Sequence, residues 1–96
     1  MMKIKEQINH NIKELDFNLI HNIIKILNIK WEDADSGEKR IPTVNEIKNI
    51  AEYCMKKAFK SENGYFAIGG FEAEVVEGYV EIKYVLAKAN PLKSIF

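Results

Sequence analysis

Few residues in this 96-residue chain have the types that enzyme chemistry needs. The main candidates for catalysis or metal binding are Cys54, His10 and His21. A catalytic nucleophile requires a base within hydrogen-bond reach and a group that orients the base. Cys54 lies on the apolar stripe of a predicted helix, where a free cysteine is ordinarily a small buried hydrophobe. The two histidines lack a third donor that could complete a metal site. The sequence therefore predicts a non-enzyme with no catalytic residue, no metal and no cofactor.

An acidic segment contains Asp33, Asp35 and Gly37, which alternate in the way that calcium-loop ligands do. A calcium loop that starts at Asp33 needs glycine at its sixth position and glutamate at its twelfth. The chain has Glu38 and Val44 at those positions. We interpret the segment as a solvated loop.

Two adjacent glycines, Gly69 and Gly70, could let backbone amides approach an anion. Charge and stacking for such a ligand would come from basic and aromatic residues elsewhere in the chain: Trp31, Lys39, Arg40, Tyr65 and Phe66. The glycines precede a predicted strand and lack the frame of a dinucleotide or P-loop motif. A ligand or partner contact at these residues and a structural bend both stay open, as does a core position for Trp31.

Four glutamates gather on the outward side of a predicted hairpin, with one lysine beside them: Glu72, Glu74, Glu77, Glu81 and Lys83. Paired carboxylates can transfer protons when a cleft separates their pKa values. On an open face, carboxylates more often keep a protein soluble and discourage edge-to-edge pairing of sheets. We interpret this acidic face in the second way.

The charge and cysteine content restrict the classes of partner and compartment. Fourteen basic residues balance fourteen acidic ones and Arg40 is the single arginine, so nucleic-acid binding is not expected. One cysteine cannot form an internal disulfide, and no apolar run reaches membrane-spanning length. We therefore expect a cytoplasmic protein with no membrane contact.

The first quarter of the chain has the spacing of an amphipathic helix over about residues 4–28. Its apolar positions recur every three or four residues: Ile4, Ile8, Ile12, Leu15, Leu19, Ile23 and Ile26. Asp16 could cap a new start by accepting from the amide of Leu19 or Asn18, so one long helix and two shorter ones both stay open. After Asp16 a second apolar stripe appears, formed by Phe17, Ile20, Ile24 and Leu27. A helix apolar on both sides needs cover from the domain or from a second copy, which suggests a homodimer.

The middle of the chain predicts a polar loop and then a helix. The loop follows Trp31 and has a Ser-Gly turn signal. Thr43 and Glu46 form a capping box for a helix over about residues 44–61, and Asn63-Gly64 supplies its stop.

The last third predicts an antiparallel hairpin over about residues 71–86, turning at Glu77-Gly78. A two-residue turn pairs Val75 with Val80 and places Glu72 opposite Lys83, of opposite charge. Residues 65–68 could add a third strand, and residues 87–96 form a tail without periodicity.

Three blocks of the sequence resemble small bacteriophage-encoded proteins of unassigned function. These blocks are LDFNLIHNIIKILNIKW, IPTVNEIKNIAEYCMKKAF and IGGFEAEV, which supply a Trp-ended helix, a Pro-Thr-capped helix and a Gly-Gly-Phe strand. The family pattern would have threonine where this chain has Ile68. The resemblance implies a phage or prophage origin, a location in the host cytoplasm and no transferable catalytic residue.

We expect a single α+β domain over residues 1–96, with two or three helices followed by a hairpin or three-stranded antiparallel sheet. The favoured function is a small non-enzymatic binding protein, a homodimer, that engages or inhibits a host defence protein. The alternative is a protein that captures a small molecule or nucleotide signal.

Overall fold

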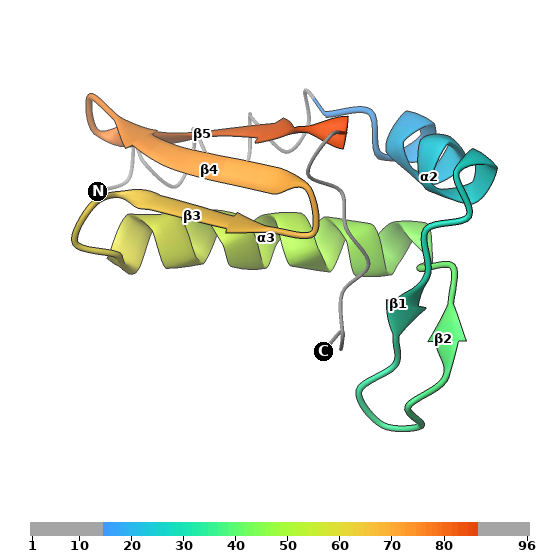
Figure 1. Cartoon of the computed structure of the whole chain (residues 1–96). Helices are drawn as coiled ribbons and strands as arrows, with labels where there is room; N and C mark the ends of the chain where they lie inside the picture. Colours follow the sequence, from blue (N-terminus) through green and yellow to red (C-terminus); the bar gives the residue numbers. More distant parts are fainter. Residues whose placement is uncertain (1–14, 87–96) are drawn as a thin grey trace.

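The structure, a computed structural model, describes residues 15–86 and is an α+β fold of two helices and two antiparallel sheets (Figure 1). This confirms the predicted fold class. The elements run in the order α2 (Phe17–Ile26), β1 (Trp31–Glu32), β2 (Lys39–Arg40), α3 (Val44–Lys60), β3 (Tyr65–Ile68), β4 (Phe71–Val76) and β5 (Tyr79–Tyr84).

Helix α2 begins where the sequence offers a cap. The Asp16 carboxylate accepts a hydrogen bond from the Leu19 amide at 3.0 Å and so caps α2, whose first residue is Phe17. It ends at Ile26, two residues before Asn28 takes a left-handed φ of 54°. Of the helix predicted over residues 4–28, the part before Leu15 and its choice of one or two helices lie outside the described residues.

The segment predicted as a loop after Trp31 forms a small hairpin instead. Strands β1 and β2 pair antiparallel, with Trp31 opposite Arg40. The Asp33 carboxylate stabilises the connection, because it accepts from the amides of Asp35 and Ser36 at 2.9 and 3.1 Å. Strands of two residues are too short to show an alternating pattern, which is why the sequence did not reveal them.

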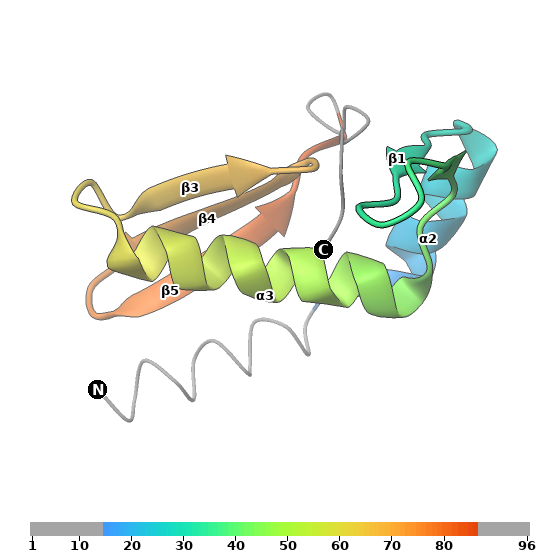
Figure 2. The same ribbon diagram turned by 90° about the horizontal axis from the view of Figure 1, so that it is seen from below.

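Helix α3 matches the prediction within one residue at its C-terminus. Thr43 and Glu46 form the predicted capping box, each side chain accepting from the other residue's backbone amide. The helix lies along one face of the larger sheet, here called the inner face (Figures 1 and 2). Its buried stripe consists of Ile47, Ile50, Ala51, Cys54, Met55 and Ala58.

The larger sheet is a meander with strand order β3-β4-β5. The predicted register is confirmed: Val75 pairs with Val80 and Glu72 with Lys83. Both hairpins use two-residue turns with left-handed backbone, at Gly69-Gly70 (φ 59° and 92°) and at Glu77-Gly78 (φ 50° and 91°). The glycine pair is thus the turn that makes Tyr65–Ile68 a full partner of β4.

Side chains from the preceding loop form hydrogen bonds with the backbone at the start of β3. The Ser61 hydroxyl donates to the Tyr65 carbonyl at 3.2 Å, and the Tyr65 amide donates to the Asn63 side chain at 3.2 Å. Backbone groups that an edge strand would otherwise expose are therefore satisfied locally.

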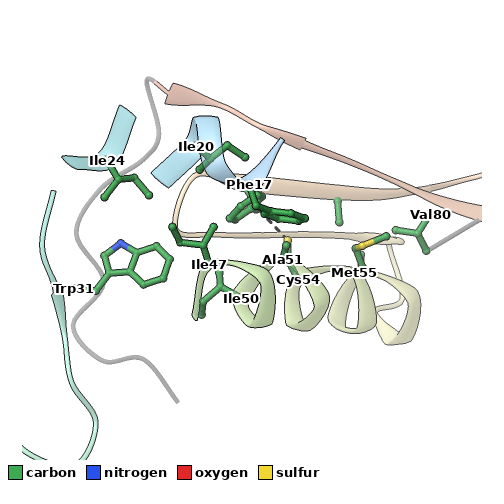
Figure 3. Close-up of a cluster of buried hydrophobic side chains, with 13 residues drawn as sticks. Phe17, Ile20, Ile24, Trp31, Ile47, Ile50, Ala51, Cys54, Met55 and Val80 are labelled. Atoms are coloured by element: carbon green, nitrogen blue, oxygen red, sulfur yellow. Dashed lines mark hydrogen bonds between the residues drawn. The ribbon is translucent and has the colours of Figure 1, made fainter. Parts of the chain in front are cut away.

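One hydrophobic core joins the two helices and the sheet (Figure 3). The Trp31 side chain is 1% exposed and points into the same cluster as Ile24 and Ile47, so it is a core residue. The Phe17 ring contacts the Phe71 ring at a centroid distance of 6.5 Å, which attaches α2 to the sheet.

We predict that Gly64→Ala destabilises the domain more than Gly37→Ala does. Both glycines have left-handed φ, so each alanine costs about 1 kcal/mol of backbone strain. A Cβ at Gly64 would also lie 3.3 Å from the Val75 Cβ, whereas one at Gly37 meets nothing within 4 Å. Urea unfolding should show about 1 kcal/mol of additional loss for Gly64→Ala. Equal losses would contradict the close approach of Gly64 to β4.

Candidate protein-binding surfaces

The residues predicted to form a ligand site are distributed over different parts of the structure. Trp31 is in the core, Lys39 is exposed on β2, and the Arg40 guanidinium is engaged by carboxylates. Tyr65 and Phe66 are neighbours on one strand and point to opposite faces of the sheet. The Phe66 ring packs edge-on against the Tyr53 ring at 5.9 Å, while Tyr65 is 38% exposed.

The glycine pair of the proposed ligand site is a hairpin turn. Gly70 is buried and its carbonyl accepts from the Val85 amide at 2.7 Å, so this backbone is used by the sheet itself. Of the residues that the sequence singled out for ligand contact, Tyr65 alone lines the hollow described below.

Arg40 is the centre of an ionic network that fastens the β1–β2 hairpin to the start of α3. Its two terminal nitrogens bond both Glu46 carboxylate oxygens at 2.6 Å, and Nη2 also bonds Asp33 Oδ2 at 2.8 Å. Hydrogen bonds from Arg40 hold the pKa of Asp33 and of Glu46 at about 2, and the carboxylates raise the pKa of Arg40 in return. Arg40 therefore has a structural role.

We predict that Glu46→Gln flattens the acid dependence of stability. The pKa of Glu46 is lowered from 4.5 to about 2 by folding, so its contribution is present above pH 4.5 and is lost as the pH falls toward 2. Thermal unfolding midpoints between pH 6 and pH 2 should fall less steeply for Glu46→Gln than for the wild type. Glu52→Gln, an exposed change on the same helix, is the control and should follow the wild type. Parallel curves for Glu46→Gln and the wild type would contradict the role of Arg40.

Cys54 is held in the core with its thiol hydrogen-bonded. The Sγ atom lies 3.3 Å from the Phe66 carbonyl oxygen and 3.7 Å from that of Phe71. Burial raises the pKa of Cys54 to about 11, so the reactive thiolate is scarce at neutral pH. Among residues 15–86 no group of histidine, cysteine and carboxylate side chains could hold a metal ion. His21 is partly buried on α2, and His10 lies outside the described residues.

We predict that Cys54 resists alkylation in the folded protein. At pH 7.5 iodoacetamide should modify it at least about 100-fold more slowly than a cysteine placed at the exposed Lys56 position in a Lys56→Cys variant. In concentrated urea both cysteines should react within minutes. Rapid modification of native Cys54 would show that the thiol is accessible. Mass spectrometry of the labelled peptides gives both rates.

A hollow of about 280 Å³ lies on the outer face of the sheet, opposite α3. Its lining comes from all three strands of the meander: Tyr65, Glu72, Ala73, Glu74, Glu81, Ile82 and Lys83. Three carboxylates and one ammonium group surround it, and the Lys83 Nζ lies 3.8 Å from Glu72 Oε1. The hollow therefore has an acidic wall with an aromatic side chain at one edge.

The strand register places two glutamates directly opposite each other in this hollow. Glu74 on β4 pairs with Glu81 on β5, and both side chains are exposed. Like charges in this position destabilise a sheet. The Tyr79 hydroxyl donates to Glu81 Oε1 at 3.0 Å, a bond that raises the pKa of Tyr79. The pattern suits a cation placed between the two carboxylates.

Sequence reasoning had assigned these glutamates to solubility. The predicted two-residue turn already places Glu74 opposite Glu81, so this pairing of like charges can be derived from the sequence. The hollow itself could not be seen in the sequence, because its shape depends on how the three strands twist.

A second surface is formed by the exposed apolar stripe of α2, which comprises Leu19, Ile23, Ile26 and Leu27. Three of these residues are largely exposed: Leu19 (54%), Ile26 (82%) and Leu27 (52%). Ile23 is partly buried. Of the second stripe predicted from the sequence, Phe17, Ile20 and Ile24 are buried against the domain, whereas Leu27 is exposed because it caps the end of the helix. Half of the predicted apolar surface of this helix is thus covered and half is exposed to solvent.

No protein-family model matches the chain, and no curated protein and no solved structure matches it either. Neither helix in the described part of the chain has the length and apolarity that crossing a bilayer requires.

Proposed function

We propose that this chain is a small non-enzymatic binding protein whose partner is a protein that presents a basic segment to the hollow on the outer face of the sheet. The observation that carries the proposal is the direct opposition of Glu74 and Glu81 at that hollow. Each strand pair could have balanced its charges, as Glu72 and Lys83 do. Within residues 15–86 no ion pair balances Glu74 or Glu81, and this repulsion is a cost that a positively charged partner would remove.

The chemistry of the hollow fits a lysine or arginine side chain. An ammonium or guanidinium group between two carboxylates makes charge-assisted hydrogen bonds, which are stronger than neutral ones. Tyr65 offers an aromatic face at the edge of the hollow, where a cation would gain further attraction. Exposed carboxylates also accelerate encounter with a basic surface, so association should weaken as salt increases.

Cys54, one of the three residues considered for catalysis, and Arg40, considered for ligand contact, have structural roles. The Cys54 thiol is buried and carbonyl-bonded, and Arg40 is neutralised by two carboxylates. For these two residues the structure therefore favours a supporting role in the fold over a role in catalysis.

The resemblance to bacteriophage-encoded proteins supports a host protein, in the host cytoplasm, as the partner. A phage protein that binds and thereby inhibits a component of host defence needs a recognition surface and no chemistry of its own. The acidic hollow is a surface of that kind.

We predict that Glu74→Lys strengthens folding and weakens binding at the same time. A lysine opposite Glu81 replaces a repulsive pair by an attractive one, so the free energy of unfolding should rise by about 0.5 kcal/mol. The same change repels a basic partner, and its affinity should fall at least about tenfold. Urea unfolding measures the first effect, and quantitative capture from a bacterial host lysate, followed by titration of the captured protein, measures the second.

Glu52→Lys is the matched control, because it makes the same charge change on the exposed side of α3. It should retain the captured partner. Equal capture by the wild type and by Glu74→Lys would contradict the proposal, as would loss of the partner from Glu52→Lys or a wild type that captures nothing.

A further inference from the structure

We infer that this chain associates with itself head to tail, with the outward side of α3 in one copy lying on the outer face of the sheet in the next. The inference deepens the proposed function and rests on one part of it, the capacity of the acidic hollow to bind a basic segment. It names the C-terminal half of α3 as such a segment. Its grounds are the unpaired charges on both surfaces, their spacing and their direction along the fold.

The outward side of α3 is basic along its last two turns. Lys56, Lys57 and Lys60 are exposed there, and within residues 15–86 no ion pair involves any of them. Lys56 is 200° around the helix from buried Cys54 at 100° per residue, so its side chain points away from the core. Lysines at this end of a helix also suit the helix dipole, which leaves their ammonium groups available to a carboxylate of another molecule.

The outer face of the sheet carries the opposite charge at the same end of the fold. Glu74 and Glu81 are exposed, lie opposite each other, and belong to no ion pair among the described residues 15–86. Helix α3 ends just before Tyr65, and Tyr65 pairs with Glu74. The lysines and these glutamates therefore lie at one end of the sheet, on its two opposite sides (Figure 1).

The charges on the two surfaces have the same spacing. Residues four apart in a helix are separated by about 6 Å along its axis, and residues two apart in a strand by about 6.6 Å. Read backward along α3, Lys56 is followed four residues later by Glu52. Read forward along β5, Glu81 is followed two residues later by Lys83. When Lys56 of one copy lies over Glu81 of the next, Glu52 lies over Lys83, and both contacts join opposite charges.

The topology gives these two series of charges the same direction. Strand β3 returns along α3, and β4 and β5 each reverse direction again, so β5 runs antiparallel to α3 (Figures 1 and 2). A second copy related to the first by translation alone therefore places α3 on the outer face of the sheet with its charges matched. Such a contact joins two different surfaces, does not close on itself and can extend to a third copy.

The chemistry of the contact sets its expected strength. Exposed ion pairs contribute little each and are screened by salt, so we expect a dissociation constant of about 0.1 to 1 mM in about 20 mM salt. At lower protein concentrations the hollow stays available to the host partner of the proposed function.

Sedimentation equilibrium over about 0.05 to 2 mM protein tests the association. In about 20 mM salt the average mass of the wild type should rise past that of a dimer, and in about 500 mM salt the chain should be monomeric. Lys25→Gln combined with Lys39→Gln is the control, because it removes two exposed positive charges outside the contact. This control should associate as the wild type does.

Two variants that each block one surface test which surfaces meet. A helix variant combines Lys56→Gln with Lys60→Gln, and a sheet variant combines Glu74→Gln with Glu81→Gln. All four side chains are exposed, so both variants should fold, with unfolding midpoints close to or above that of the wild type. Each variant alone should be monomeric. An equimolar mixture should form a complex of two chains and nothing larger, because it retains one intact pair of surfaces.

Amide chemical shifts in the same mixture locate the contact. When the helix variant carries the ¹⁵N label, the signals that move should belong to β4 and β5. When the sheet variant carries the label, they should belong to the C-terminal half of α3. A contact between identical surfaces would instead move the same residues in both experiments.

Any of four results would overturn the inference. The wild type could stay monomeric at low salt, its mass could level off at that of a dimer, or its association could strengthen with salt. The mixed variants could also fail to combine. None of these results would touch the proposed function, since capture of a host protein is measured separately. Equal capture by the wild type and by Glu74→Lys would contradict that function without affecting the sedimentation result.

Discussion

The burial of one helix stripe against one sheet face is the constraint on which the rest of this structure depends. Six side chains of α3, from Ile47 to Ala58, are buried, and the meander β3-β4-β5 provides the apolar face that covers them. Because a three-stranded sheet has only two faces, this packing leaves the other face outside the contact between α3 and the sheet. Strand alternation then sends every second residue outward, which is how three glutamates come to surround one hollow.

The second helix depends on the same packing. Helix α2 reaches the core through Phe17, whose ring contacts Phe71, and the Trp31 side chain completes the cluster at that end of α3. The ionic network of Arg40 then fixes the short hairpin that carries Trp31 to the first turn of α3. The domain is thus stabilised by apolar packing in its core and by the Arg40 ion pairs at its surface. Neither the core packing nor the Arg40 ion pairs cover the exposed apolar stripe of α2, since the core lies on the other side of that helix.

Most of the fold could be predicted from local signals in the sequence. The capping box at Thr43 and Glu46, the cap at Asp16 and the register of the second hairpin were all predictable, because each depends on residues close together in the chain. The β1–β2 hairpin was missed because its strands have two residues each. The candidate site was predicted less well. The ligand residues were chosen by type from distant parts of the chain, and the fold directs Trp31 and Phe66 inward and Tyr65 outward. Side-chain direction across a whole fold follows from packing, which composition and spacing do not encode.

The two left-handed turns of the meander have a consequence for how the chain folds. With only Gly69-Gly70 and Glu77-Gly78 between paired strands, every contact within this sheet joins residues close in sequence. Little entropy is lost in closing such short loops, and folding rates rise as contacts become more local. The strand pairs can form once residues 65–84 have left the ribosome. Helix α3 precedes these strands in the chain and is therefore synthesised before them. The meander can therefore pair early in folding, whereas the contacts of α2 and α3 with it join residues further apart in the chain.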